Sequence, residues 1–464
     1  MTDIPVTAPF DGSEITTVPN ATREDVERAL ATAHGLYRDR DGWLSKPQRI
    51  EILRKAAEII KERRQELSVA AAREGGKPLP DSLVEIDRAA DGVENCVEVL
   101  RSEGGRVIPM SLNPSSTGRV AFTQFEPIGV VVAVSAFNHP FNLIVHQVAP
   151  AIAVGCPVIV KPADVTPLSC YAFVEILYEA GLPKEWCQVL VPQDLGDASA
   201  LVTDERNAFF SFIGSARVGW MLRSQLAPGT RCALEHGGAA PVILAADADL
   251  DDALPRLAKG GFYHAGQVCV SVQRIFAHSS IAAKSAEKLA EIGAAMKVGD
   301  PTLADTEVGP LIRNSEVDRV DEWVQAAIAG GAKCLTGGER VSDSCYKPTV
   351  LLDPPADANV STMEIFGPVI CVYSYDDLDA AIAQANSLPV SFQAAVMTKD
   401  IDTAMRVYNR IDATAVMVNE HTAFRVDWMP FAGARQSGHG VGGIPFTMHE
   451  MQVEKMMVLR SDEL

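Results

Sequence analysis

The feature that most constrains the fold is an alternation, from residue 129 onward, of short apolar runs with longer stretches of helical pattern. Strands built from such runs are covered on both faces, as in a parallel sheet. Helical connections between them are typical of a doubly wound α/β architecture. The runs occupy residues 130–134, 158–160, 188–191, 209–212 and 242–245.

A second α/β stretch follows between residues 248 and 420, so we expect two doubly wound α/β domains. Its strand candidates are residues 274–277, 369–373 and 394–397. Residues 118–126 and 453–459 are β-prone and fall outside both predicted sheets. They predict a small appended ribbon of the kind that pairs between subunits.

Two amphipathic helices are predicted ahead of the first strand. Thr22 and Asp25 have the spacing of a capping pair at the start of a helix over residues 22–38. Ser45 followed by Pro47 marks the start of a second helix.

Charge and cysteine usage exclude several classes of protein. The chain has 41 basic and 60 acidic residues, a net charge of −19, so we expect no nucleic-acid partner. Nine scattered cysteines without a Cys-x-x-Cys pair indicate neither a disulfide framework nor a metal site. No long apolar segment or leader pattern is present. These observations favour a cytoplasmic protein without a membrane partner.

A glycine-rich segment at residues 438–443 matches the G-x-G-x-x-G pattern of dinucleotide-binding proteins. That pattern must close a strand and open a helix within a βαβ unit of about 30 residues. Too few residues follow Gly443 for such a unit. We therefore interpret the segment as a place where two backbones pass closely.

Two strand ends are better candidates for binding a nucleotide. Gly214 and Ser215 follow an apolar run and precede a helical pattern, where backbone N–H groups and the hydroxyl can hold a pyrophosphate. The alternative is that Ser215 merely caps the helix. Lys161 and Asp164 end another run and can bind ribose hydroxyls. The alternative there is a surface lysine and a helix-capping aspartate.

Three residues are candidates for catalysis. Cys269 follows a small polar segment, where a thiol at a helix N-terminus would have a lowered pKa. Glu235 lies beside two glycines and can serve as a mobile base. Asn138 follows a buried strand, and its amide can donate to an oxyanion. Each also has a plain structural interpretation, as a buried thiol, a surface turn glutamate and a turn asparagine before proline.

The order and spacing of these segments resemble the NAD(P)-dependent aldehyde dehydrogenase superfamily over almost the whole chain. The motifs that carry the resemblance are FNHP at 137–140, VKPAD at 160–164, FIGS at 212–215, LEHGG at 234–238, GQVC at 266–269, EIFGP at 364–368 and MPFAG at 429–433. The wording around His139 is similar to the branch of lactaldehyde, glycolaldehyde and phosphonoacetaldehyde dehydrogenases.

The resemblance implies a role for each candidate. Cys269 would be the nucleophile, Glu235 the general base, and Asn138 an oxyanion donor. The implied cofactor contacts are Lys161, Asp164, Gly214, Ser215, Glu364 and Phe366. The implied layout is a cofactor domain (1–116 and 129–236), a catalytic domain (237–435), the first part of an oligomerisation ribbon (117–128), and a C-terminal loop with the rest of the ribbon (436–464).

Several residues differ from those most common in the family at the same motif positions, and these differences bear on the substrate. His139 and His146 are seven residues apart and would share a helix face, giving a polar tunnel; the alternative is that each packs against backbone carbonyls. Val268 stands where phosphonate-type members tend to have arginine, which argues against a strongly anionic substrate. Arg425 is either a substrate partner or part of an ion pair near Asp427. Together with the two histidines it would supply local positive charge. Trp428 and Phe431 are expected to line the tunnel.

The expected activity is therefore NAD(P)-dependent oxidation of a small polar aldehyde to its acid in a homodimer or homotetramer. Asp164 is one methylene shorter than the glutamate usual in the family, so NAD would be only slightly preferred and NADP also used. The alternatives are a coenzyme A-acylating dehydrogenase and a non-catalytic cofactor-binding scaffold.

Overall fold

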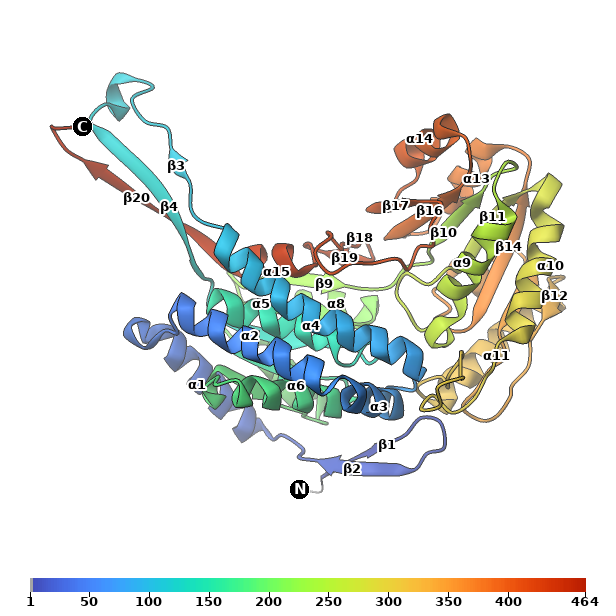
Figure 1. Ribbon diagram of the computed structural model, residues 1–464, viewed down its shortest axis with the longest axis horizontal. Helices are drawn as coiled ribbons and strands as arrows, with labels where there is room; N and C mark the ends of the chain where they lie inside the picture. Colours follow the sequence, from blue (N-terminus) through green and yellow to red (C-terminus); the bar gives the residue numbers. More distant parts are fainter. Residues whose placement is uncertain (1–2) are drawn as a thin grey trace.

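The computed structural model describes residues 3–464, so residues 1 and 2 of the expected cofactor domain lie outside the described residues. Two mainly parallel sheets with helices on their faces form the body, and a long ribbon extends away from it (Figure 1). The expected α/β class with two doubly wound sheets is confirmed.

The first sheet has six strands in the order β19-β9-β8-β5-β6-β7, and only β19 runs antiparallel to its neighbour. Four of the predicted apolar runs are strands of this sheet. Its strands are β5 (Val130–Val134), β6 (Val158–Lys161), β7 (Cys187–Val189), β8 (Asn207–Ile213), β9 (Arg231–Glu235) and β19 (Gly438–His439). The sequence did not predict β9, because its exposed Arg231 and half-buried Cys232 interrupt the apolar pattern.

Helices cover both faces of this sheet. Helices α2, α4, α5, α6 and α15 share one apolar core, and α1 packs with α7 and α8 on the opposite face. The predicted capping pair of Thr22 and Asp25 is confirmed, and the second helix begins after Ser45 as predicted, where Ser45 and Gln48 form a capping box as well. The helices are α1 (Arg23–Arg38), α2 (Lys46–Glu62), α3 (Arg64–Gly75), α4 (Leu79–Ser102), α5 (Asn142–Val154), α6 (Pro167–Glu179), α7 (Leu195–Thr203), α8 (Ala216–Arg223) and α15 (Ile444–Glu450).

The second sheet has seven strands in the order β12-β13-β14-β11-β10-β16-β17, and only β12 is antiparallel. Grouping the run at 242–245 with the first sheet was wrong: it forms β10, which pairs with β11 and β16. A buried apolar run shows that a strand is covered, but not in which sheet it lies. The strands are β10 (Pro241–Leu244), β11 (Arg274–His278), β12 (Lys333–Thr336), β13 (Thr349–Leu352), β14 (Val369–Tyr375), β16 (Gln393–Met397) and β17 (Ala415–Val418).

The second sheet has its own helices and its own apolar core. In Figure 1 they form the half of the body that is coloured from yellow-green to orange-red. The helices are α9 (Leu250–Phe262), η4 (Tyr263–Gly266), α10 (Ser279–Ala295), α11 (Asn314–Ala329), α12 (Asn359–Thr362), α13 (Leu378–Ala385) and α14 (Ile401–Arg410).

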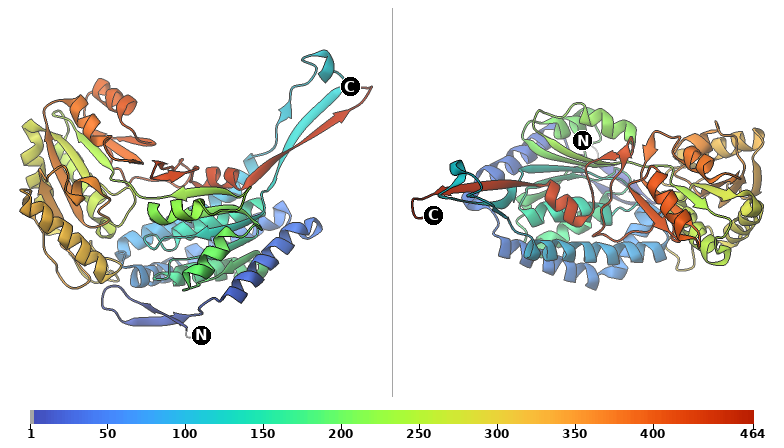
Figure 2. Two further views of the ribbon diagram at one scale, coloured as in Figure 1. Left: turned by 180° about the vertical axis from the view of Figure 1, so that it is seen from behind. Right: turned by 90° about the horizontal axis from the view of Figure 1, so that it is seen from above.

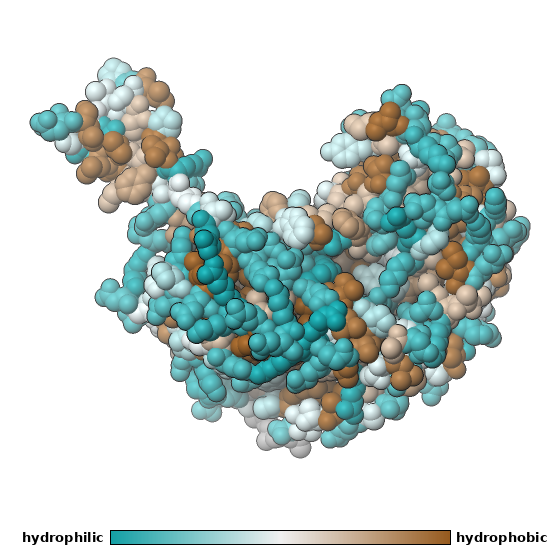
Figure 3. Space-filling model, in the orientation of Figure 1, coloured by the Kyte–Doolittle hydropathy of each residue, from teal (hydrophilic) through white to brown (hydrophobic). Residues whose placement is uncertain are grey.

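The predicted ribbon is a three-stranded antiparallel sheet in the order β20-β4-β3. Strands β4 (Arg119–Pro127) and β20 (Gln452–Arg460) pair along nine residues, and β3 (Val107–Ile108) adds a short edge. Figures 1 and 2 show that the ribbon leaves the body and carries the C-terminus near its tip. Apolar side chains on it are exposed, among them Val107, Met456 and Leu459, and Figure 3 shows this apolar surface.

Candidate active site

Neighbouring strands of the six-stranded sheet deliver the predicted site residues to one edge. Strand β5 leads to Asn138, β6 ends at Lys161, β8 leads to Gly214, and β9 ends at Glu235. The chain order reverses between β5 and β8, and ligands bind at the carboxyl ends of parallel strands beside such a reversal. A cavity of about 720 Å³ opens there, and Cys269 lies in its wall.

The nucleophile candidate lies in a turn between η4 and β11. Buried Gln267 fixes this turn: its Nε2 donates to the His264 and Pro310 carbonyls at 3.2 Å each, and its Oε1 accepts the Ile312 N–H at 2.9 Å. The expected helix N-terminus at Cys269 is wrong, because the following segment extends into β11. Burial and nearby carboxylates raise the pKa of Cys269 to about 12, against the expected lowering.

Asn138 is tied directly to this turn. Its Nδ2 donates to the Gln267 carbonyl at 2.9 Å, which places the amide beside the nucleophile loop with one N–H still available. Both residues are buried and Asn138 lines the cavity. The arrangement suits an oxyanion donor whose direction is already set.

Glu235 occupies the end of β9 and faces the same cavity. Its pKa is raised by burial, an effect that Arg425 partly offsets. The glycine-rich segment at 438–443 makes room for it: Gly438 pairs with Glu235 across β19 and β9, and a Cβ at Gly442 would overlap the Glu235 carboxylate. The interpretation of this segment as a close backbone approach is confirmed.

All six predicted cofactor contacts line the cavity. Ser215 occupies the N-cap position of α8 but its side chain makes no capping hydrogen bond, so the hydroxyl is not engaged in capping. Asp164 does not cap a helix either; Thr166 holds that position at α6, and the Asp164 carboxylate pairs with Arg313 at 3.0 Å. The Lys161 Nζ donates to the Pro162 carbonyl at 3.3 Å, and burial lowers its pKa.

Glu364 and Phe366 approach from the second half of the molecule. Burial raises the pKa of Glu364 to about 8, and its Oε1 is buried without a hydrogen-bond partner among the described residues. A Cβ at Gly237 would overlap this carboxylate. Phe366 has a left-handed φ of 49° and meets Phe137 edge to face. An unsatisfied buried acid on a cavity wall fits a ligand with hydroxyl groups.

Asp427 organises a polar cluster whose members Arg88, His146 and Arg425 line the same cavity. It accepts two hydrogen bonds from Arg88, at 3.1 and 2.6 Å, and a third from His146 Nε2 at 2.7 Å. Arg425 Nη2 lies 3.3 Å from His146 Nδ1, and its guanidinium lies 3.6 Å from the centre of the Phe431 ring. Arg425 therefore lines the cavity and also lies 3.9 Å from Asp427, and its contact with a substrate stays a prediction.

Several expectations about the substrate side need correction. His139 is not on a helix face with His146, because α5 begins only at Asn142. Neither histidine bonds a backbone carbonyl within residues 3–464; His139 instead meets His264 edge to face. Burial lowers the pKa of both, which disfavours the charged imidazolium and opposes the expected local positive charge. Trp428 is 52% exposed and lies outside the cavity wall, whereas Val268 and Phe431 line it.

Sequence reasoning missed the residues that orient the others. Gln267 was noted only as part of a motif, although its buried amide fixes the nucleophile turn. Arg88 lies on α4, far from every motif, yet it pairs with Asp427. A charged residue on an otherwise amphipathic helix gives no signal of such a partner, because the contact joins positions far apart in the chain.

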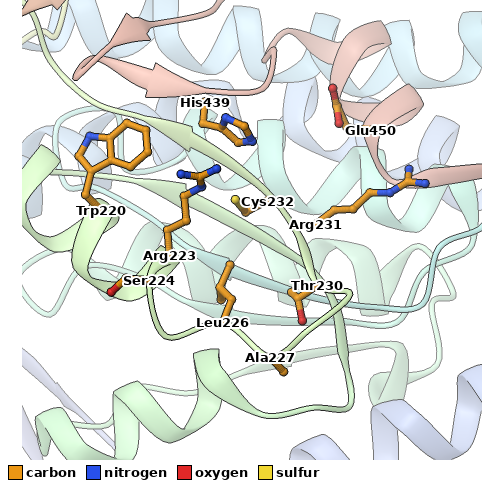
Figure 4. A pocket seen from close by; sticks show the side chains of 10 residues that line it. All are labelled: Trp220, Arg223, Ser224, Leu226, Ala227, Thr230, Arg231, Cys232, His439 and Glu450. Carbon is orange, nitrogen blue, oxygen red and sulfur yellow. The ribbon is translucent and has the colours of Figure 1, made fainter.

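A second hollow of about 510 Å³ lies beside β9 and α8 (Figure 4). Arg223, Arg231 and His439 project around it, and Cys232 lies at its centre. None of the predicted site residues lines it. Within residues 3–464 no group of three or more potential ligands could hold a metal ion. No helix in the same range is long and apolar enough to cross a membrane.

Comparisons with known proteins agree with this geometry. The aldehyde dehydrogenase family profile matches residues 1–457. The 3-sulfolactaldehyde dehydrogenase of Priestia aryabhattai is 37% identical over 439 residues, covering 95% of this chain and 91% of that protein.

Solved structures superpose closely. Aldehyde dehydrogenase 21 of Physcomitrella patens, in complex with the reaction product succinate, gives a TM-score of 0.94 at 34% identity, covering 99% of this chain and 95% of that one. The glyceraldehyde-3-phosphate dehydrogenase of Methanocaldococcus jannaschii, complexed with NADP, gives 0.94 at 32% identity, covering 99% and 100%. The chain belongs to the aldehyde dehydrogenase family and is an oxidoreductase that acts on aldehydes.

Proposed function

We propose that the protein oxidises a small polar aldehyde to the carboxylic acid with a nicotinamide cofactor. The observation that carries the proposal is the convergence of Cys269, Asn138 and Glu235 on one cavity. The similar Priestia aryabhattai protein is named for sulfolactaldehyde, and the similar Physcomitrella patens enzyme holds succinate; both are short polar compounds.

Another part of the cavity wall fits a dinucleotide. Ser215, with its uncommitted hydroxyl at the start of α8, would hold the pyrophosphate, and Lys161 with Asp164 the adenosine ribose. Glu364, whose Oε1 lacks a partner within residues 3–464, and Phe366 would hold the nicotinamide riboside. The bound cofactor supplies an acceptor for the hydride that leaves the substrate carbon.

The proposed chemistry uses three side chains. The Cys269 thiol loses its proton to solvent, and the thiolate attacks the aldehyde carbon. The resulting oxyanion accepts hydrogen bonds from Asn138 Nδ2 and the Cys269 backbone N–H, and one such donor contributes roughly 3 to 4 kcal/mol. Loss of hydride turns the thiohemiacetal into a thioester. Glu235 then takes a proton from a water molecule, which adds to the thioester and releases the acid and the thiol. A base at this position favours hydrolysis over transfer to coenzyme A.

We propose that the enzyme uses NAD and NADP, with NAD slightly preferred. The Asp164 carboxylate would repel a 2′-phosphate, but Arg313, 3.0 Å away, offers a cation at the same place. We further propose that the ribbon of β3, β4 and β20 pairs with a second copy in a dimer or tetramer. Its exposed apolar side chains and the unpaired edge of β20 support this assembly. We also propose a cytoplasmic location.

The direct test is a panel of aldehydes supplied with NAD or NADP. Glycolaldehyde, lactaldehyde and succinic semialdehyde are expected to be turned over better than hexanal and benzaldehyde. A clear preference for either apolar aldehyde would contradict the polar substrate class.

The nucleophile is tested by Cys269→Ala. Loss of the nucleophile should lower NADH formation by about 10⁵-fold, while cofactor binding, followed by quenching of protein fluorescence, is retained. Cys334→Ala removes another half-buried thiol, on β12, and serves as the control. Turnover that survives in Cys269→Ala would show that the nucleophile is another residue.

A further inference from the structure

The charges of the polar cluster do not balance. Asp427 is a single buried carboxylate, and its oxygens already accept two hydrogen bonds from Arg88 and one from His146. Arg425 reaches it only at 3.9 Å, beyond hydrogen-bond distance. One carboxylate therefore faces two guanidinium groups.

His146 links Asp427 to Arg425 as a neutral group. Its Nε2 donates to the carboxylate at 2.7 Å and its Nδ1 accepts from Arg425 Nη2 at 3.3 Å, which sets the tautomer. A neutral imidazole transmits orientation without adding charge. Arg425 is thus held in place by a chain that starts at Arg88.

Arg425 retains unused binding capacity. Its Nε is buried and has no acceptor within residues 3–464, while its guanidinium plane lies against the Phe431 ring, which fixes the plane. The nearest other acid in the cavity is Glu235, whose burial favours the neutral carboxyl. Arg425 shares the Asp427 carboxylate with Arg88 and has no hydrogen-bonded acid of its own within residues 3–464. A buried cation whose charge is only partly balanced is costly, so the site is poised to bind an anion.

We propose that Arg425 binds an anionic group, a carboxylate or a sulfonate, at the far end of a short aldehyde substrate, and that His146 and Asp427 are positioning residues for it. Guanidinium matches the geometry of these oxyanions through paired N–H donors. Val268, where some relatives carry a cation, lies on the same wall; the cation comes instead from the loop after β17. This inference rests on the proposed aldehyde oxidation and narrows its substrate class.

The experiment compares three aldehydes of similar length: succinic semialdehyde, 3-sulfopropanal and the neutral pentanal. In Arg425→Met, kcat/KM for the two anionic aldehydes should fall about 100-fold, since a hydrogen-bonded charge contact is lost, while pentanal changes less than about threefold. Arg425→Lys keeps the positive charge but lacks the paired N–H donors of the guanidinium, so kcat/KM for the anionic aldehydes should fall by an intermediate factor. Arg340→Met, which removes an exposed arginine paired with Asp318, is the control.

The positioning role has its own readout. In His146→Gln the KM for the anionic aldehydes should rise about tenfold with kcat unchanged, because orientation is loosened while the nucleophile is untouched. An equal change for pentanal would indicate a merely structural role and would overturn this part of the proposal.

The outcomes separate the two levels of inference. If no aldehyde is turned over, the proposed oxidation fails. If pentanal is oxidised as well as the anions, or if Arg425→Met lowers all three equally, only the anion site is refuted. A loss restricted to one of the two anionic aldehydes supports the site and identifies the group it prefers.

Discussion

The residues of the active site form two groups whose charges have different surroundings. We call Cys269 and Glu235 the reactive side, and Asp427 with Arg88, His146 and Arg425 the networked side. Around Cys269 and Glu235, the reactive groups have no hydrogen-bonded cationic partner within residues 3–464, and burial raises both pKa values. Around Asp427, Arg88 and His146 donate directly to the carboxylate, and its pKa is held well below the ordinary value. Reactive groups and binding groups thus occupy contrasting environments in one cavity.

The difference follows from what each side has to do. A nucleophile and a base must change protonation state during turnover, so strong ion pairs that lock one state would hinder them. A binding group gains from a fixed direction and a fixed charge, which a hydrogen-bonded network supplies. The predictions below remove one side at a time.

Glu235→Gln removes the base on the reactive side and should have the largest effect of the changes compared below. Steady turnover is expected to fall about 10³-fold because the thioester is no longer hydrolysed, within the range of general-base contributions. A burst of NADH equal to the number of active sites should remain, because hydride loss comes first. Stopped-flow absorbance measures both phases, and Glu450→Gln, beside the second hollow, is the control. Steady turnover at the wild-type rate would rule out this role.

Asp427→Asn breaks the networked side. It leaves Arg88 and Arg425 without a carboxylate, and removing one partner of a buried ion pair costs about 3 to 5 kcal/mol of unfolding free energy. Urea unfolding measures the loss, and Asp379→Asn, which breaks exposed pairs with Arg406 and Arg410, should cost less than about 1 kcal/mol.

The same variant has a predictable pH dependence. The pKa of Asp427 is lowered in the folded state by His146 and Arg88. Its contribution to stability is therefore present above the unfolded pKa near 4 and lost as the pH falls towards the folded value. The gap between wild type and Asp427→Asn should narrow in acid; a gap that widens would contradict this assignment.

The contrast also explains what the sequence could reveal. The reactive side sits at strand ends and within short motifs, so Asn138, Glu235 and Cys269 could be identified from local pattern and family resemblance. The networked side joins α4, α5 and the loop after β17. The residues next to Arg88 and Asp427 in the sequence give no sign that these two side chains form an ion pair. Burial, which reverses the expected pKa shift of Cys269 and neutralises the histidines, depends on the packed structure as a whole.

The raised pKa of Cys269 predicts how the free enzyme reacts with iodoacetamide. Only the thiolate is alkylated, and a pKa of about 12 keeps its fraction small at neutral pH. The rate of inactivation without cofactor should therefore increase about tenfold per pH unit between about pH 7 and 9 without levelling off. In Cys269→Ser any alkylation that is measured occurs at the other thiols, so this variant gives their contribution. A plateau in that range would show that the reactive side lowers the pKa after all.

The smallest expected effect concerns the Asp164–Arg313 pair at the cavity rim and the relative affinity for NADP and NAD. Both side chains are more than half exposed, and exposed pairs contribute less than about 1 kcal/mol. Without Arg313 the Asp164 carboxylate would face a 2′-phosphate unopposed, so Arg313→Ala should weaken NADP relative to NAD by up to about fivefold. Fluorescence titration of both cofactors measures the ratio without turnover. The effect should shrink at high salt, because exposed charges are screened, whereas the Arg425 discrimination inside the cavity should persist. If the ratio of NADP to NAD affinity did not change with salt, Arg313 would behave as a buried charge like those around Asp427, and not as an exposed charge at the rim.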